Sequence, residues 1–425
     1  MLKKSLFAIL LTISLLLGSV FSALAEENLK ALELDIEPEA IPVLLTADKN
    51  LPALAAILIS QNTGQVLYEQ NPDLQLPPAS ITKVMTMLLV VEALARNEVT
   101  LDDIVTASVY ASSMGGSQIW LEPGEEMTLH ELFKAVAVAS ANDAATALAE
   151  YIAGSEDVFV ALMNQRAAEL GMKNTHFENC SGLDSEGHLT TARDIAIMSR
   201  ELMGYPIMKE YSTIWTDTLR DGKIELTNTN KLVRFYQGCT GLKTGTTDGA
   251  GSCLSVTATR DETGLVAVVM GCETSNDRFS SARGLLDYGF ANYLMTGLPD
   301  ISEQLLPVKV LRGINLDVRV VCELPEELLV ERGNQDKIEQ LIKLVGDVTA
   351  PVERGQKLGT VEIKIDSESF AIYPILADEA VEKINLLAAY EKMLRALLNT
   401  ASPKNQELHL PQMATVTDDA LQQSL

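Results

Sequence analysis

Cysteine and histidine are scarce in this sequence, and their spacing does not suit a metal site. The chain has five cysteines and four histidines, with no Cys-x-x-Cys pair and no histidine cluster beside a cysteine. We therefore expect neither a zinc site nor any other cofactor. Five cysteines are also too few for a disulfide scaffold. We expect them to be small buried side chains, with a Cys239–Cys253 bridge as an open alternative.

Basic residues are also few. The chain has 33 lysines and arginines against 58 acidic residues, a net charge of −25. Nucleic-acid-binding proteins need basic patches that attract phosphate, so this composition argues against that class. The acidic residues are spread along the chain, as expected for an ordinary solvated surface.

Long apolar runs are missing beyond the N-terminus. Residues 1–25 combine Lys3 and Lys4, an apolar run over 6–20 and a small-residue site at 23–25, which is typical of a signal peptide. An uncleaved N-terminal anchor is the alternative. Either way we expect an extracytoplasmic protein, secreted through the membrane and acting at its outer face, in the periplasm or in the cell wall. No later stretch is long and apolar enough to span a membrane.

The remaining chain is too long for one core, and its patterns predict a mixed α/β (α+β) fold. Strand-like residues 53–60 and 65–69 form a hairpin, a helix-rich region follows, and strands return at 252–260 and 265–272. If late strands pair with early ones, one sheet forms with a helical insert. The predicted divisions after the leader are a lead-in 26–45, a main domain 46–298, a small β domain 299–377, an amphipathic helix 378–399 and a disordered tail 400–425.

The helix predicted at 378–399 has one apolar stripe, which includes Leu386, Tyr390 and Met393. Such a helix could lie in a membrane interface as a peripheral contact. Acidic residues balance its basic ones, so attraction to anionic lipid would be weak. Packing on its own domain or on a partner is the alternative.

Ser80 and Lys83 form a Ser-x-x-Lys pair where a buried helix begins. Pro77 and Pro78 precede them, and an apolar run follows over 84–94. A spacing of three puts both side chains on one helix face. Serine becomes nucleophilic when a base takes its proton, and a lysine can do so if its pKa is lowered. Taken alone, the pair is weak evidence, and an N-cap serine with an exposed lysine is the better interpretation.

Two further motifs favour the catalytic interpretation of Ser80 and Lys83. Ser140-Ala141-Asn142 is a Ser-x-Asn, and Lys243-Thr244-Gly245 is a Lys-Thr-Gly on a strand. The three motifs in this order are the mark of penicillin-binding proteins and class A β-lactamases. With the stretches 116–125 and 182–194, the chain resembles the D-alanyl-D-alanine carboxypeptidases, the low-molecular-mass penicillin-binding proteins, over about 45–399.

The resemblance implies a β-lactamase/transpeptidase-like catalytic domain, its sheet covered by helices, followed by a small β domain. It implies a serine enzyme that removes the terminal D-alanine from peptidoglycan stem pentapeptides through an acyl-enzyme, in cell wall biogenesis and cell shape. β-Lactam antibiotics would be covalent inhibitors.

The implied roles follow the needs of acyl transfer. Ser80 would be the nucleophile, Lys83 the base, Ser140 the proton route to the leaving amine, and Asn142 a hydrogen-bond partner of Lys83 or the substrate. Lys243 would keep Lys83 neutral by repulsion. The backbone N–H groups of Ser80 and Thr246 would form the oxyanion hole. The implied substrate-binding residues are Lys243, Thr244, Gly245, Thr246 and Arg278, with Arg283 as the alternative arginine.

Three other functions compete. A β-lactamase would need a glutamate that activates water. No Glu-x-x-Leu-Asn pattern follows the second motif, although Glu178 lies in the right region. A non-catalytic wall-binding or sporulation protein would be free to lose Lys83 or Lys243. A D,D-endopeptidase is not distinguished by sequence. Asn179-Cys180-Ser181 departs from the family's usual proline-containing loop, and a polar tail follows the last helix.

Overall fold

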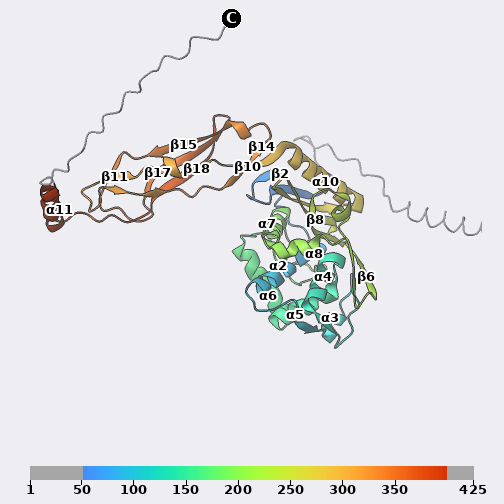
Figure 1. The fold of residues 1–425 in the computed structure, drawn as a ribbon. Helices are drawn as coiled ribbons and strands as arrows, with labels where there is room; N and C mark the ends of the chain where they lie inside the picture. Colours follow the sequence, from blue (N-terminus) through green and yellow to red (C-terminus); the bar gives the residue numbers. More distant parts are fainter. Residues whose placement is uncertain (1–50, 400–425) are drawn as a thin grey trace, which may run out of the picture. The chain divides into compact units, whose positions relative to one another are not determined.

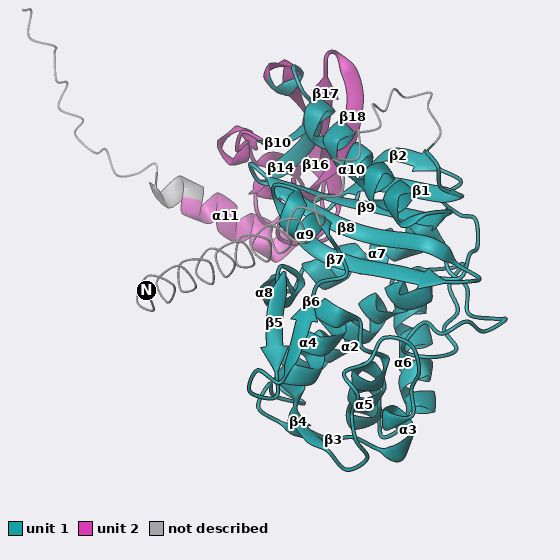
Figure 2. Ribbon diagram, turned by 90° about the vertical axis from the view of Figure 1, so that its right-hand side faces the viewer, with its two compact units in different colours: residues 1–297, 327–335 teal, residues 298–326, 336–425 magenta. Residues whose placement is uncertain are grey.

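The structure is a computed structural model that describes residues 51–399 and forms two compact units (Figure 1). Within the described residues, the first unit contains 51–297 together with Glu327–Gln335, and the second contains Leu298–Glu326 and 336–399 (Figure 2). The predicted leader 1–25, lead-in 26–45 and tail 400–425 lie outside the described residues. The domain boundaries proposed from sequence remain predictions.

A five-stranded antiparallel sheet organises the first unit, in the order β2-β1-β9-β8-β7. Its strands are β1 (Ala55–Ser60), β2 (Val66–Gln70), β7 (Cys239–Thr247), β8 (Gly251–Arg260) and β9 (Thr263–Cys272). The early strand β1 pairs with the late strand β9, with Ala55 opposite Met270. The predicted fold class, one sheet with a helical insert between its halves, is confirmed.

Helices cover both faces of this sheet, as Figure 2 shows for α10 on one side and α2 and α7 on the other. Ile57 and Ile59 belong to the core that contains α2, whereas Ala56 and Leu58 belong to the core beneath α10. Every residue of β1 is therefore buried. A strand covered on both faces is a continuous apolar run without polar alternation.

The insert and the closing helix supply the remaining elements of the first unit. They are η1 (Ala79–Thr82), α2 (Lys83–Ala95), β3 (Ile104–Thr106), α3 (Val109–Ser112), β4 (Glu126–Thr128), α4 (Leu129–Ala139), α5 (Asn142–Ala153), α6 (Glu156–Glu169), α7 (Ala192–Met203), α8 (Pro206–Ser212), β5 (Thr216–Leu219), β6 (Ile224–Thr227), α9 (Leu232–Phe235), α10 (Ser275–Asn292) and β10 (Tyr293–Gly297). A capping box opens α4, because Thr128 accepts a hydrogen bond from the Glu131 N–H and Glu131 accepts one from the Thr128 N–H.

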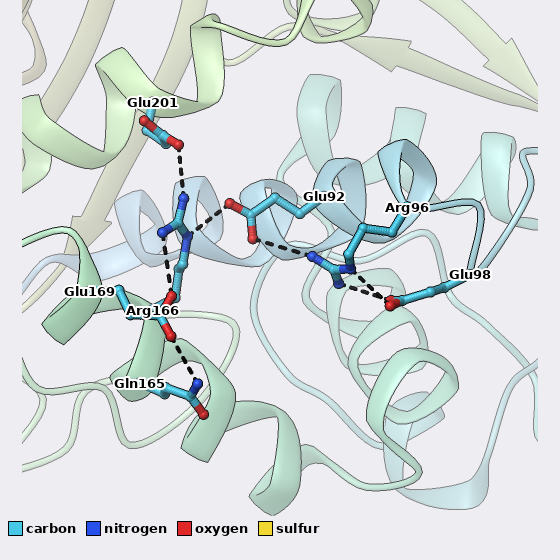
Figure 3. A network of polar contacts seen from close by, with 7 residues as sticks. All are labelled: Glu92, Arg96, Glu98, Gln165, Arg166, Glu169 and Glu201. Atoms are coloured by element: carbon cyan, nitrogen blue, oxygen red, sulfur yellow. Dashed lines mark hydrogen bonds and ion pairs between the residues drawn. The ribbon is translucent and has the colours of Figure 1, made fainter. Parts of the chain in front are cut away.

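Ion pairs tie the C-terminal half of α2 to α6 and α7 (Figure 3). The Arg166 guanidinium contacts Glu92 Oε1 and Glu201 Oε1, each at 2.8 Å. Arg96 reaches Glu92 at 3.9 Å and the exposed Glu98 at 2.8 Å. Glu92 is only 7% exposed. Arg166 therefore joins three helices through one nearly buried carboxylate and a second at the surface.

The second unit is a small β structure around its own apolar core. Its strands are β11 (Val308–Leu311), β12 (Asp317–Val318), β13 (Val320–Val321), β15 (Ile338–Leu344), β16 (Asp347–Thr349), β17 (Lys357–Ile365) and β18 (Glu368–Ala377), with the short turns η2 (Ser302–Gln304) and η3 (Gln335–Lys337) nearby. The intervening β14 (Glu327–Glu331) pairs instead with β10, which places it in the first unit.

The last helix, α11 (Leu386–Asn399), is shorter than the predicted 378–399. Residues before it are bound to the β structure: Val381 and Val352 exchange backbone hydrogen bonds, and Ile384 N–H donates to the Arg312 carbonyl. Val381 is also buried. Strand pairing and burial therefore override the helical pattern there, and the predicted helix start at 378 was wrong. Within residues 51–399, no helix has the length and apolar character needed to cross a membrane.

Candidate active site

Ser80 lies in a tight 3₁₀ turn, η1, that leads directly into α2. Lys83 is the first residue of α2, and its Nζ lies 3.0 Å from Ser80 Oγ. In a 3₁₀ turn, residues three apart lie almost directly above one another. The Ser-x-x-Lys spacing thus places the amine beside the hydroxyl, while Ser80 itself stays partly exposed.

Lys83 is fully buried and surrounded by neutral acceptors. Besides Ser80, its Nζ donates to Asn142 Oδ1 and to the backbone carbonyl of Ser181, each at 2.6 Å. Burial lowers the pKa of Lys83 to about 7, although Cys180 and Asp143 act in the opposite direction. The carbonyl oxygens of Asn142 and Ser181 can only accept hydrogen bonds. They hold two N–H groups of Lys83, so the third position on its nitrogen faces Ser80.

Lys243 is also fully buried and donates to the Thr244 carbonyl at 2.9 Å. Burial holds its pKa well below 10.5, and the charges of Lys83 and Arg278 lower it further. The main cause of the lowered pKa of Lys83 is its own burial, and the neighbouring charges of Cys180 and Asp143 raise that pKa. The expected repulsion by Lys243 is not needed to explain the lowered pKa and stays a prediction.

The Ser-x-Asn motif forms the junction between α4 and α5. Ser140 ends α4 in the left-handed conformation (φ 63°, ψ 29°), and Asn142 begins α5. Asn142 Nδ2 donates to the Gly115 carbonyl at 2.7 Å, which directs Oδ1 towards Lys83. A left-handed serine is uncommon and is found where surrounding structure determines it. The junction brings Asn142 into contact with Lys83, and Ser140 is buried two residues before it.

Asp143, which sequence reasoning did not single out, fixes the neighbouring loop. Its buried carboxylate accepts hydrogen bonds from the N–H groups of Ile119, Leu121 and Ala144. An acidic residue in the first turn of a helix is the only signal in the sequence. Ile119 and Leu121 lie more than twenty positions away, so local pattern does not reveal these two partners.

The Lys-Thr-Gly motif lies on β7, one of the two edge strands of the sheet, against the turn that holds Ser80. A Cβ at Gly245 would lie 2.9 Å from the Pro78 carbonyl oxygen and 3.1 Å from Ser80 N. Only glycine allows the two backbones to approach this closely. Thr244 Oγ1 donates to Thr229 Oγ1 at 2.7 Å.

Arg278, on α10, reaches the same part of β7. Its Nη1 donates to Thr246 Oγ1 at 2.8 Å and to the Gly245 carbonyl at 3.1 Å. The residue is 9% exposed, and among the described residues its Nε has no hydrogen-bond partner. Arg283, the alternative, lies further along α10, where its charge acts on Tyr236. The structure thus brings Arg278 to the motif and does not bring Arg283 there.

The loop before α7 completes the surroundings of Lys83 through backbone groups. Its Ser181 carbonyl accepts from Lys83, and its Glu178 carboxylate bonds to Ser185 and Gly187 of the same loop. His188 accepts from the Glu178 N–H and contacts Thr82 Oγ1 at 2.8 Å. Burial lowers the pKa of His188 to about 4, so it is neutral near pH 7. Glu178 is therefore engaged within its own loop.

The five cysteine thiols are all free. On the paired strands, Cys239 lies opposite Ala258 and Cys253 opposite Gly245, so the two sulfurs are several residues apart along the ladder. The alternative of a Cys239–Cys253 bridge does not occur. Within residues 51–395, no group of three or more His, Cys, Asp or Glu side chains could hold a metal ion.

Residues 43–274 match the family described as D-alanyl-D-alanine carboxypeptidase, Peptidase S11, and residues 302–383 match the penicillin-binding protein 5 C-terminal domain. The chain belongs to the D-alanyl-D-alanine carboxypeptidase family. It is a serine hydrolase of this family, and the predicted fold and enzyme class are confirmed.

Curated relatives resemble this carboxypeptidase over most of its length. It is 41% identical to D-alanyl-D-alanine carboxypeptidase DacF of Bacillus subtilis over 346 residues, which cover 80% of this chain and 89% of the relative. DacC of Escherichia coli is 33% identical over 79% of this chain and 85% of its own.

Solved structures of related proteins show the same likeness. Penicillin-binding protein 5 of Haemophilus influenzae has a TM-score of 0.73 and 29% identity, covering 80% of this chain and 100% of its own. Penicillin-binding protein D2 of Listeria monocytogenes, solved in the ampicillin-bound form, has a TM-score of 0.51 and 34% identity over 57% of this chain and 99% of its own.

Proposed function

We propose that Ser80 is the nucleophile with which this carboxypeptidase removes the terminal D-alanine from peptidoglycan stem pentapeptides. The observation that carries the proposal is the contact of 3.0 Å between Ser80 Oγ and the buried Nζ of Lys83. Neutral acceptors hold the other two N–H groups of that amine. When Lys83 is neutral, its lone pair faces the serine hydroxyl. This is the arrangement that general-base activation of a serine requires.

The reaction then proceeds in two halves. Ser80 Oγ attacks the carbonyl carbon of the penultimate D-alanine while Lys83 accepts its proton. The tetrahedral intermediate collapses, the C–N bond breaks, and the leaving amine takes a proton that passes from Lys83 through Ser140. A water then attacks the carbonyl carbon of the Ser80 ester while Lys83 accepts its proton. The bond from that carbon to Ser80 Oγ breaks, and Lys83 returns the proton to Oγ. The N–H groups of Ser80 and Thr246 would hold the oxyanion in both halves.

The substrate's terminal carboxylate would bind along β7. Lys243 and the hydroxyls of Thr244 and Thr246 would line this position, and Gly245 allows the close approach of β7 to the turn that holds Ser80. Arg278 supports Thr246 from behind and supplies a permanent positive charge. An incoming carboxylate would also favour the protonated form of Lys243, because opposite charges stabilise each other.

β-Lactams would acylate the same serine, which the antibiotic-bound form of a relative supports for the family. We further propose an extracytoplasmic enzyme of cell wall biogenesis and cell shape, exported by the leader 1–25. The helix α11 would make a peripheral membrane contact, since Leu386, Leu387 and Tyr390 are 92%, 78% and 59% exposed. Cosedimentation of the purified chain with anionic vesicles tests that contact, and a chain lacking α11 is its control.

The decisive experiment incubates the purified enzyme with a pentapeptide ending in D-Ala-D-Ala and measures released D-alanine. Release by the wild type, with loss of both release and fluorescent-penicillin labelling in Ser80→Ala, is the expected result. Labelling that survives in Ser80→Ala would remove Ser80 as the nucleophile. Rapid penicillin turnover without peptide cleavage would identify a β-lactamase, and cleavage of crosslinked stems in preference to pentapeptide would identify an endopeptidase.

A further inference from the structure

The side chain of Asn179 bonds to several backbone groups of the loop next to Lys83, and these hydrogen bonds together are called the Asn179 clasp. Its Oδ1 accepts from the N–H of Gly182 at 2.6 Å and from the N–H groups of Ser181 and Leu183 at 3.2 Å each. Its Nδ2 donates to the Leu183 carbonyl at 2.9 Å. Three N–H donors converge on one oxygen, so the amide has a single orientation that satisfies them. This is an Asx-type turn, in which a side chain replaces missing backbone partners.

The clasp acts on the same peptide group that contacts Lys83. The carbonyl of Ser181 and the N–H of Gly182 belong to one planar unit, and in a trans peptide they point in opposite directions. Asn179 holds the N–H at 2.6 Å on one side, and Lys83 donates to the carbonyl at 2.6 Å on the other. Fixing the N–H therefore fixes the direction of the carbonyl.

Regular structure does not hold this peptide, because it lies in neither a helix nor a strand. Upstream, the backbone of Cys180 is anchored by Glu156 and Thr86. Downstream, Gly182 (φ 86°) is pressed so closely against the nucleophile turn that a Cβ would lie 1.8 Å from the Ala79 carbonyl oxygen. Between these anchors, the side-chain bond from Asn179 sets the rotation of the peptide plane.

We propose that Asn179 is a positioning residue for the general base, which it orients through the Ser181–Gly182 peptide group; this inference rests on the proposed role of Lys83. With the peptide fixed, Lys83 keeps two carbonyl acceptors and directs its third valence to Ser80. Without the clasp the peptide can rotate, one acceptor is lost, and the amine no longer has a single orientation.

The test compares Asn179→Ala, Asn179→Asp and the matched control Asn164→Ala. Asn164 bonds through both its Oδ1 and its Nδ2 to the backbone of Phe177, at 2.8 Å each, in the same segment but away from the Ser181–Gly182 peptide. The measurement is the second-order rate of fluorescent-penicillin acylation across the pH range in which Lys83 titrates. Thermal unfolding of each variant checks that it is folded.

We expect Asn179→Ala to slow acylation about 10- to 100-fold at every pH, because misplacement of a catalytic group affects the rate on that scale. Asn179→Asp keeps the accepting oxygen and so keeps the plateau rate. Its carboxylate near Lys83 displaces the rise in rate to higher pH. Asn164→Ala should acylate at the wild-type rate despite some loss of stability.

A wild-type rate and pH profile in Asn179→Ala would overturn the proposal, as would an equal loss of rate in Asn164→Ala. If Asn179→Ala does not fold, Asn179→Asp decides: an unchanged pH profile, or a loss of the plateau, counts against the clasp. A wild-type enzyme that fails to acylate would instead remove the proposed function. Normal wild-type acylation with undiminished Asn179→Ala removes only this inference.

Discussion

The N-terminal end of α2 carries a buried cationic side chain with neutral partners, whereas its C-terminal end carries paired charges. Lys83 contacts a hydroxyl and two carbonyl oxygens. Thirteen positions on, Arg96 is bonded to Glu98, and Glu92, which lies between Lys83 and Arg96, is bonded to Arg166. Within residues 51–395, none of Lys83, Lys243 and Arg278 makes an ion pair, whereas the far end of α2 has several (Figure 3).

The N-terminal end of α2 is suited to proton transfer, whereas its C-terminal end serves structural support. A buried amine without a carboxylate partner loses protons more readily, and burial lowers the pKa of Lys83 to about 7. A carboxylate partner would raise that pKa again. Asp143 is near, but backbone N–H groups already occupy its carboxylate. Arg166, by contrast, remains charged between its acidic partners and serves packing.

The largest effect is expected from removing the amine of Lys83, which has no ion-pair partner among the described residues. Lys83→Ala should slow acylation by fluorescent penicillin about 10³-fold, since general bases contribute on that scale. Lys83→Arg is the sharper control: its guanidinium keeps a positive charge and donors but does not deprotonate in proteins. We expect it to be equally slow. Recovery of acylation in Lys83→Arg would contradict the base role and leave only an electrostatic one.

Arg278 also makes no ion pair within the part of the chain that the structure describes, and removing its charge should weaken binding of the peptide more than it slows the chemical step. Arg278→Gln is expected to lower kcat/KM for the pentapeptide about 10- to 100-fold, chiefly through KM, because a charge-assisted bond near the substrate carboxylate contributes about 1.5–3 kcal/mol. Arg283→Gln, on the same helix, is the matched variant and should match the wild type. The reverse ranking of the two variants in steady-state kinetics would reassign the carboxylate site.

At the paired end of α2, the loss should be one of stability alone. Glu92→Gln leaves Arg166 with only its more exposed partners and should lower the free energy of unfolding by about 2 kcal/mol. Chemical denaturation measures this change. Penicillin acylation by the folded variant should keep the wild-type rate and pH dependence. A displaced pH profile would show that the two ends of the helix are coupled.

The pH dependence of acylation follows from the sign of the Lys83 shift. Only the neutral amine accepts a proton, so the rate should rise with pH through about 7, the lowered pKa. Below that value each pH unit should reduce the rate about tenfold. Stopped-flow acylation over this range measures the limb, which should disappear in Lys83→Ala. A flat profile in the wild type would show that Lys83 is not the group that titrates.

The smallest effect is expected at the surface. The Arg96 side chain is 54% exposed, as is its closest partner Glu98. Exposed ion pairs are screened and contribute about 0–1 kcal/mol. Arg96→Ala should therefore shift the thermal midpoint very little, measured beside Glu92→Gln under the same conditions. A loss as large as that of Glu92→Gln would mean that the exposed part of the network carries its stability.

Sequence predicted much of the fold because its signals are local. The apolar run of β1 and the capping box at Thr128 and Glu131 appear where expected. The prediction that the last helix begins at residue 378 was wrong, because the backbone of Val381 pairs with that of Val352. The local sequence gives no sign of this pairing. Likewise, β14 pairs with a strand outside its sequence neighbourhood. Long-range partners override local periodicity in both cases.

The candidate active site, like the fold, could be predicted from the sequence only in part. Ser80 and Lys83 were recognisable only with the two other motifs, since their spacing alone is common. The Ser181 carbonyl was missed because every residue has one, and only the loop's path makes this one important. The neutrality of Lys83 was expected, but its cause was assigned to Lys243. Burial depends on the whole fold, and no motif reports it.

The sheet order also has a consequence for the newly made chain. Ser60 pairs with Leu265, so β1 and β2 are synthesised long before β9 is available to them. A two-stranded hairpin is at best marginally stable in water, and distant pairings form late in folding. The turn that holds Ser80 likewise lacks its support until Gly245 has been made. Ser80 is therefore an ordinary, unactivated alcohol while most of the chain is being synthesised. A chain truncated before β9 should not react with penicillin.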